Sequence, residues 1–187
     1  MEEMYEIKQA AKCYKDAGNL FEKDDASSQA NQMFVKSADL SATCDDPDWA
    51  EIIQTYEKII AAYLRKDILK MSAKGLMIKA VLASMAYQDV VGAEKKYDKF
   101  CFDDPGFQGS REGDVLMACM QAVKDNDKKA FDSAIKEYNW VTPFGRVEKA
   151  MLATIIDTFS QVTGGVEKGD DLDIPEDEED DNELDLR

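Results

Sequence analysis

The sequence predicts an all-α fold built from antiparallel helix pairs, and three observations lead to this prediction. The stretch from Trp49 to Leu64 carries its apolar side chains at helical spacing. Similar stretches, each containing a tyrosine, recur at a nearly constant offset along the 187 residues. The alternation of β-branched and polar residues that is typical of strands is absent from the sequence.

The stretch from Trp49 to Leu64 is predicted to form an amphipathic helix. Its apolar residues are spaced i, i+1, i+4, i+7, i+8 and i+11, and they are Ile52, Ile53, Tyr56, Ile59, Ile60 and Tyr63. At 3.6 residues per turn, this spacing places them on one face. Asp48 precedes the helix, where a carboxylate suits the helix dipole. Because an isolated helix of this length is marginally stable in water, the apolar face predicts a partner helix.

Four predicted helices contain a tyrosine, and together they define a repeat. The tyrosines are separated by 42, 41 and 41 residues, and they are Tyr14, Tyr56, Tyr97 and Tyr138. A constant offset over four segments is typical of a repeat array. The first of these helices spans Met4 to Phe21. Because each tyrosine lies on an apolar helical stripe, we expect the four rings to pack in the core.

A second helix is predicted after each tyrosine helix. These second helices are rich in Ala, Met and Leu, which favour helix formation, and they span Ser27 to Cys44, Leu69 to Tyr87, Ser110 to Lys124 and Gly145 to Val162. Ser27 or Ser28 is the candidate N-cap of the first one. Loops containing proline separate several of the helices, at residues 45–47, 103–106 and 142–143.

The repeat unit is therefore a helix pair of about 40 residues, longer than the roughly 34-residue tetratricopeptide unit but similar in kind. We predict a tetratricopeptide-like right-handed α-solenoid of four helix pairs over residues 1–165. Residues 166–187 contain 12 acidic and 2 basic residues and few apolar ones, which predicts a disordered acidic tail. Solenoids of this kind bind extended or helical partners more often than they catalyse reactions.

The composition argues against an enzyme. The sequence has no histidine, which removes the commonest general base and the commonest zinc ligand. It shows no glycine-rich phosphate loop, metal-ligand cluster or nucleophile–base set, so we predict no catalytic residue, no metal and no cofactor. The four cysteines lack C-x-x-C spacing and are expected to be small buried hydrophobes; they are Cys13, Cys44, Cys101 and Cys119.

The charge and hydropathy patterns restrict the partners and the compartment. A net charge of −16 disfavours binding to nucleic acid through its phosphates. No apolar run approaches the length of a membrane span. The first residues, MEEMYEIKQAAK, are charged rather than apolar, so we expect no signal peptide and a reduced, cytoplasmic setting. Membrane association is then expected to be peripheral and mediated by a partner.

Four stretches in this order resemble the soluble NSF attachment protein (SNAP) family, closest to its α-SNAP-like branch. They are SSQANQMFVKSAD from Ser27, the run from Tyr56 through LKMSAKGLMIKAVL, EKKYDKF followed by SRE at Ser110, and IKEYNW followed by a last helix and an acidic end. The resemblance covers nearly the whole chain but only about the last two-thirds of a family member. It implies that the amino-terminal helices are missing, together with the apolar loop by which such proteins touch membranes.

The resemblance implies an adaptor function in vesicle-mediated transport and membrane fusion. The family binds the four-helix SNARE bundle on its concave face and recruits the AAA ATPase NSF, which disassembles the bundle. Basic residues on the SNARE-facing surface match this chain at Lys36, Lys74 and Arg111, with Lys70 as a neighbour. A basic patch would steer and orient the acidic surface of a SNARE bundle.

The resemblance also implies a surface for NSF. The family uses carboxylates near its carboxyl-terminal helices, where this chain has Gln88, Gln121, Lys124 and Asp125, and only Asp125 is acidic in place. The penultimate leucine with which the family stimulates the ATPase matches Leu186.

Two other readings of the same residues remain open. The basic residues are also explained as ordinary solvated surface charges. The altered carboxylates would also suit a generic tetratricopeptide-like scaffold or co-chaperone that has lost NSF binding.

Overall fold

The computed structural model describes residues 2–162 and the side chains of residues 5–159. Every regular element in the described residues is helical, which confirms the predicted all-α class. The elements are α1 (Glu2–Lys23), α2 (Ser27–Ala42), α3 (Trp49–Leu64), the 3-10 helix η1 (Asp67–Leu69), α4 (Lys70–Ala86), α5 (Val90–Asp103), α6 (Arg111–Lys124), α7 (Lys128–Val141) and α8 (Arg146–Val162). The predicted acidic tail, residues 166–187, lies outside the described part.

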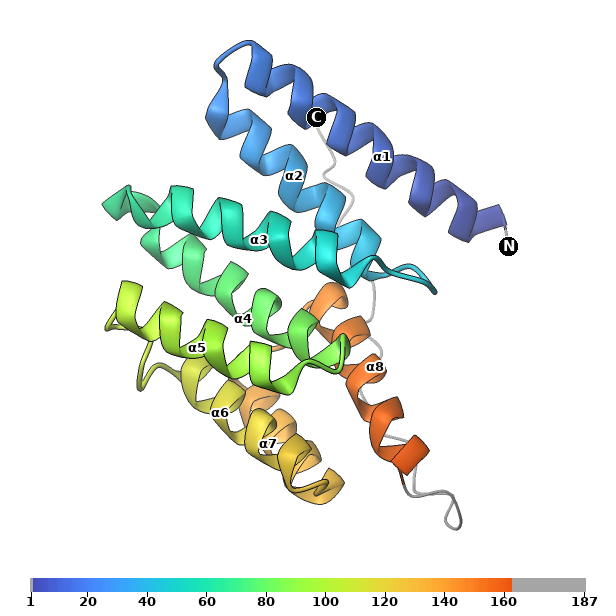
Figure 1. Ribbon diagram of the computed structural model, residues 1–187, viewed down its shortest axis with the longest axis vertical. Helices are drawn as coiled ribbons and strands as arrows, with labels where there is room; N and C mark the ends of the chain where they lie inside the picture. Colours follow the sequence, from blue (N-terminus) through green and yellow to red (C-terminus); the bar gives the residue numbers. More distant parts are fainter. Residues whose placement is uncertain (1, 163–187) are drawn as a thin grey trace, which may run out of the picture.

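The helices stack in chain order from α1 to α7, each packed antiparallel on the one before it (Figure 1). This arrangement confirms the predicted solenoid of antiparallel helices. Helix α8 departs from this order, because it packs on α4 and α2 rather than mainly on α7. Its Phe159 meets Phe131 of α7 with ring centroids 5.3 Å apart. The repeat pattern did not predict that α8 would return to the earlier helices.

The core is centred on α4. This helix has α3 and α5 on its two sides and also contacts α6 and α8. Eleven of its 17 residues are buried, and these are mostly alanine and large aliphatic side chains. The predicted stripe of α3 packs against it: Ile52, Tyr56 and Ile59 are at most 2 % exposed. Removal of these apolar surfaces from water is the main force that holds the helices together.

Three of the four repeat tyrosines are buried as predicted. Tyr56, Tyr97 and Tyr138 are at most 7 % exposed. Tyr14 is only half-buried, because α1 packs on α2 and leaves much of its own surface open. The prediction of a core ring at Tyr14 is therefore correct only in part.

Aspartate side chains cap the starts of the three later tyrosine helices. The predicted role of Asp48 is confirmed, because its carboxylate accepts a hydrogen bond of 3.0 Å from the backbone N–H of Glu51. Asp89 and Asp127 cap α5 and α7 in the same way. The prediction of a serine cap on α2 is wrong: Ser27 is already helical, and Ala26 holds the cap position without a side-chain hydrogen bond. Caps of this kind satisfy backbone donors that a helix start leaves unpaired.

Three turns share one backbone conformation. Between α1 and α2, α4 and α5, and α6 and α7, a residue with positive φ lies next to the start of the following helix. These residues are Asp25, Gln88 and Asn126, with φ of 54°, 62° and 52°. In the second turn, the N–H of Asp89 donates to the carbonyl of Ser84, which satisfies one of the last carbonyls of α4.

A polar cluster holds α8 to the interior of the array. The Tyr56 hydroxyl of α3 donates to Asp39 of α2 at 2.6 Å, and Lys79 Nζ of α4 donates to the same carboxylate at 3.0 Å. Lys79 Nζ also lies 3.8 Å from Glu148 of α8. Burial and the neighbouring carboxylate of Asp39 raise the pKa of Tyr56, so its hydroxyl stays protonated and can donate. One lysine thus connects three helices that are far apart in the sequence.

The cysteines differ in their surroundings. Cys44 and Cys119 are buried, as predicted, and burial raises the pKa of the Cys119 thiol to about 12. Cys101 is half-buried. Cys13 is exposed on α1, so the prediction of a buried side chain there is wrong. The outer surface of α1 explains this difference, because no described helix covers it.

Candidate partner-binding surface

A hollow of about 350 Å³ lies between α4, α6 and the turn that joins α7 to α8. Lys74 and Met71 of α4 line one side of it, and Tyr138 and Thr142 line the other. Arg111, at the start of α6, is hydrogen-bonded to these last two residues. The structure therefore brings Lys74 and Arg111, which are 37 positions apart in the sequence, to the border of one hollow.

Lys74 is held by the turn between α5 and α6. Its Nζ donates a hydrogen bond of 2.7 Å to the carbonyl of Gly106 and lies 4.0 Å from Asp104 Oδ2. That carboxylate oxygen is buried and has no hydrogen-bond partner among the described residues. The Lys74 side chain is only 21 % exposed. It therefore fixes the turn that leads into α6, and it offers a partner less free charge than the sequence suggested.

Arg111 is held by α7. Its Nη1 donates to Thr142 Oγ1 at 3.1 Å and its Nη2 donates to the Tyr138 carbonyl at 3.4 Å. The guanidinium also lies 5.5 Å from the centroid of the Tyr138 ring, a cation–π distance. Burial, followed by the charge of Glu112, raises the pKa of Tyr138 to about 12. A guanidinium has five N–H donors, so Arg111 keeps donors for a partner while its plane is fixed.

The other two predicted basic residues have different settings. Lys70 lies one helical turn before Lys74, is exposed, and forms an ion pair with Asp67 at 2.7 Å. This hydrogen-bonded contact lowers the pKa of Asp67 and raises that of Lys70. Lys36 is on α2, with its Nζ 5.4 Å from the ring centroid of Tyr14, and it does not line the hollow. The predicted basic set thus divides into one group around the hollow and one separate lysine.

The predicted NSF-side residue, Asp125, lies at the other end of α6 from Arg111. A helix of this length separates its two ends by roughly 20 Å. The Asp125 carboxylate is exposed and accepts a hydrogen bond of 2.8 Å from Gln121 Nε2. Lys124 next to it pairs with Glu94 of α5. Leu186, the other predicted residue, lies outside the described part of the chain.

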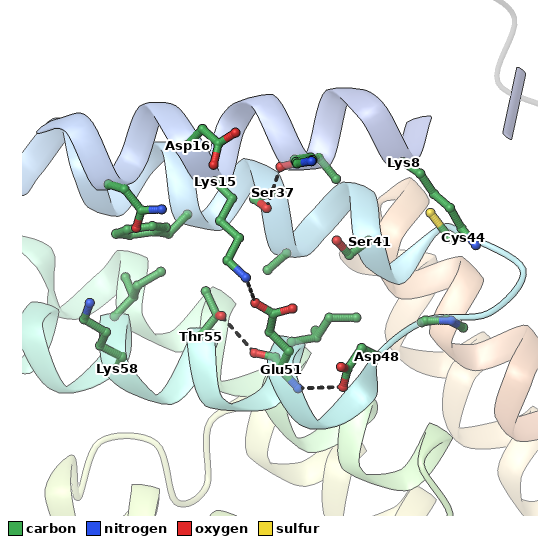
Figure 2. Close-up of a pocket in the computed structure, with 18 of the residues that line it drawn as sticks. Lys8, Lys15, Asp16, Ser37, Ser41, Cys44, Asp48, Glu51, Thr55 and Lys58 are labelled. Atoms are coloured by element: carbon green, nitrogen blue, oxygen red, sulfur yellow. Dashed lines mark hydrogen bonds and ion pairs between the residues drawn. The ribbon is translucent and has the colours of Figure 1, made fainter. Parts of the chain in front are cut away.

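A larger cleft, of about 630 Å³, lies between α1, α2 and α3 (Figure 2). Two ion pairs span it, Lys15 with Glu51 and Lys58 with Glu22. None of the described residues that were predicted to bind a partner lines it. The sequence did contain a signal for this cleft. Lysines recur at positions 8, 12 and 15, a spacing that places three of them on one face of α1.

Known protein families include one whose sequence model matches this chain. The model of the family described as "Soluble NSF attachment protein, SNAP" matches residues 1–160. The chain belongs to the soluble NSF attachment protein family. The match extends over α1 to α7 and most of α8, so the region with the hollow and the cleft lies inside it.

Individual relatives agree with this SNAP membership. A "Probable vesicular-fusion protein sec17 homolog" of Neurospora crassa is 31 % identical over 82 % of this chain and 52 % of its own length. The "Vesicular-fusion protein SEC17" of Komagataella phaffii is 27 % identical over 90 % of this chain and 54 % of its own. An "Alpha-soluble NSF attachment protein" of Vitis vinifera is 28 % identical, over 82 % and 54 %. The chain spans about half the length of the curated relatives it matches.

The SNAP helices of residues 2–162 include none that is both long enough and apolar enough to cross a bilayer.

Proposed function

We propose that this chain is an adaptor that binds a SNARE four-helix bundle and recruits an NSF-like AAA ATPase to it. The observation that carries the proposal is the family match over residues 1–160, because the family description itself names attachment to NSF. The names of the relatives from Neurospora and Komagataella, which refer to vesicular fusion, support the same process. In this function the adaptor contributes binding surfaces, and the ATPase performs the chemical step.

The hollow between α4, α6 and the α7–α8 turn is the proposed contact for the SNARE bundle. Arg111 supplies a guanidinium of fixed orientation, which suits bidentate contact with carboxylates. Lys70 is exposed one helical turn before Lys74 and is paired with Asp67, a partner that lies at the surface and can be exchanged for a carboxylate of the bundle. Lys74 contributes mainly by holding the α5–α6 turn and hence the start of α6. Lys36 makes a second, separate basic contact in this proposal.

The acidic end of α6, at Asp125, is the proposed contact for the ATPase, together with Leu186. The two proposed contacts lie at opposite ends of α6, so they use different side chains. Because Lys124 is paired with Glu94, its positive charge is partly neutralised beside Asp125. This pairing supports an acidic contact at Asp125, although Gln121 and Lys124 stand where the family has carboxylates.

A capture experiment tests the SNARE contact. Assembled SNARE bundles on beads should retain the wild-type chain, and Lys70→Glu combined with Arg111→Glu should lower the affinity at least about tenfold, since close charge pairs across interfaces contribute 1.5 kcal/mol or more. The matched control is Lys8→Glu with Lys12→Glu, which reverses two exposed lysines that line the other cleft. Equal capture by the wild type and the first variant contradicts the placement of the contact, and no capture of the wild type contradicts the function.

An ATPase assay tests the second contact. Addition of NSF to the captured complex should raise its ATP hydrolysis, and Leu186→Ala should lower that stimulation without releasing the chain from the bundle. Leu184→Ala, a leucine two positions earlier in the same acidic stretch, is the matched control. Capture without any stimulation would support the alternative function of a scaffold or co-chaperone that does not recruit NSF.

A further inference from the structure

The turn between α3 and α4 exposes two large apolar side chains. Ile68, in the 3-10 helix η1, is 93 % exposed, and Met71, in the first turn of α4, is 77 % exposed. Further along the same helix, Leu76 and Met77 are almost fully buried. Scattered apolar residues are common on protein surfaces, but a nearly fully exposed isoleucine at a turn gains nothing from the fold. Its side chain is therefore free to contact something outside the described chain.

The same turn is positively charged. Arg65, Lys66 and Lys70 are all exposed, and Asp67 is the one acidic residue in this segment from Arg65 to Met71. The chain as a whole carries a net charge of −16. The turn therefore combines local positive charge with exposed apolar side chains in a protein that is otherwise acidic.

The turn between α5 and α6 gives an internal comparison. Phe102, in the last turn of α5 just before this connection, is 86 % exposed, close to the exposure of Ile68. Its neighbours in the sequence are Asp103 and Asp104, which are negative. The two turns thus expose similar apolar surface in electrostatic settings of opposite sign.

We propose that the α3–α4 turn binds an anionic lipid surface directly. Ile68 and Met71 enter the interface between headgroups and acyl chains, while Arg65, Lys66 and Lys70 contact the phosphates and carboxylates of the headgroups. Basic residues near an anionic leaflet each contribute to binding, and apolar side chains add the burial term. One turn of this size binds weakly and reversibly, so it adds to attachment through a partner. The proposal does not depend on SNARE or NSF binding.

The occupant is a lipid surface because of the shape and charge of the turn. Ile68 does not line either the hollow or the cleft described above, so it offers no concave site for a protein side chain. A protruding apolar residue surrounded by cations suits a soft, negatively charged surface instead. Because Met71 lines the hollow, its exposure also fits a protein contact. Ile68 is therefore the residue whose substitution tests lipid binding.

Vesicle flotation tests the proposal with the full chain. The probes are vesicles of phosphatidylcholine alone and vesicles that contain 30 mol% phosphatidylserine. The wild-type chain should float with the second kind, and high salt should release it. Ile68→Ser should lower the partition coefficient about tenfold through lost apolar burial. Arg65→Ala with Lys66→Ala should lower it about 25-fold, at about fivefold for each charge.

Phe102→Ser is the matched control, because it removes an equally exposed apolar side chain from a negative turn, and its partition should stay within about twofold of the wild type. The proposal is overturned if the wild type does not bind anionic vesicles, or if Ile68→Ser and Phe102→Ser behave alike. Bead capture of SNARE bundles without lipid distinguishes the two sites. If Ile68→Ser weakens that capture and leaves flotation unchanged, the turn is a protein contact and the lipid proposal is wrong.

Discussion

Helices α1 and α4 belong to the same kind of repeat, yet they are buried to very different degrees. Helix α4 buries eleven of its 17 residues, whereas Ala11 and Gly18 are the buried positions among the described residues 5–23 of α1. Helix α4 has packed helices around it, while α1 packs on α2 and faces α3 across a cleft spanned by ion pairs. The place of a helix in the array therefore decides how much of its apolar surface is removed from water.

The difference also separates buried surface from surface that is open to a partner. The interior of α4 leaves little room for change, while its first turn is exposed and carries Lys70 and Met71. In α1, polar side chains line the large cleft, and Phe21 is the described α1 residue that packs against the main core. Substitution of the same residue type in the two helices should therefore change the free energy of unfolding by unequal amounts. A comparison of such variants tests whether burial differs between α1 and α4 in this way.

The largest difference is expected for leucine. Leu82 of α4 is 1 % exposed and Leu20 of α1 is 61 % exposed. Leu82→Ala should lower the free energy of unfolding by about 3 kcal/mol, through lost transfer energy and the cavity left behind. Leu20→Ala should change it by less than about 0.5 kcal/mol. Urea denaturation followed by circular dichroism measures both, and equal effects would mean that α1 is buried by another copy or partner.

The second largest effect is expected at the lysine that connects α2, α4 and α8. Lys79→Met keeps the aliphatic stem but leaves Asp39 and Glu148 without their cation. Both carboxylates are largely buried, so we expect a loss of about 2 kcal/mol. Adding Glu148→Gln should recover part of this loss, because it removes one unpaired charge, and a double-mutant cycle measures the coupling. Additive effects would show that the 3.8 Å contact carries no energy.

The sequence predicted the helices well because their signals are local. Apolar periodicity predicts the stripe of α3, and the position of Asp48 predicts a carboxylate near the helix start, where the structure shows it capping the helix. The attachment of α8 to α2 and α4 could not be predicted, because Lys79 and Glu148 are 69 positions apart and no local pattern pairs them. Exposed Cys13 was missed for a related reason, since its burial depends on which helices surround α1.

The candidate site was predicted in part. Resemblance predicts Lys74 and Arg111, and the fold places Lys74 in the lining of the hollow and Arg111 at its border, bonded to Thr142. The sequence could not show that their charged groups already bind Gly106 and Thr142, since those contacts join different turns. It also could not show that Lys36 lies apart from the hollow, against Tyr14. Which of these residues contact a partner remains a proposal.

A smaller effect on the free energy of unfolding is expected in the turns that follow α1 and α4. There a substitution changes the strain of the backbone conformation rather than the buried surface. Asp25 and Gln88 both have positive φ, a region that glycine adopts without strain. Aspartate tolerates this region better than glutamine does. Gln88→Gly should therefore raise the free energy of unfolding by about 0.5 kcal/mol, and Asp25→Gly should raise it less. Thermal unfolding measures both, and a loss of stability at Gln88→Gly would contradict the assigned strain.

The smallest effect is expected for the ion pair between α1 and α3. Lys15 and Glu51 are each about half exposed, so water and salt screen their attraction. Lys15→Ala should cost about 0.3 kcal/mol at low ionic strength and nothing measurable in 0.5 M salt. The comparison is with Lys79→Met, whose effect should persist in salt because its partners are buried. Hydrogen exchange of the α1 amides sharpens the test, because a contact of this kind restrains local opening of an outer helix more than global unfolding. If Lys15→Ala instead destabilised the whole chain, α1 would be as integral to the core as α4.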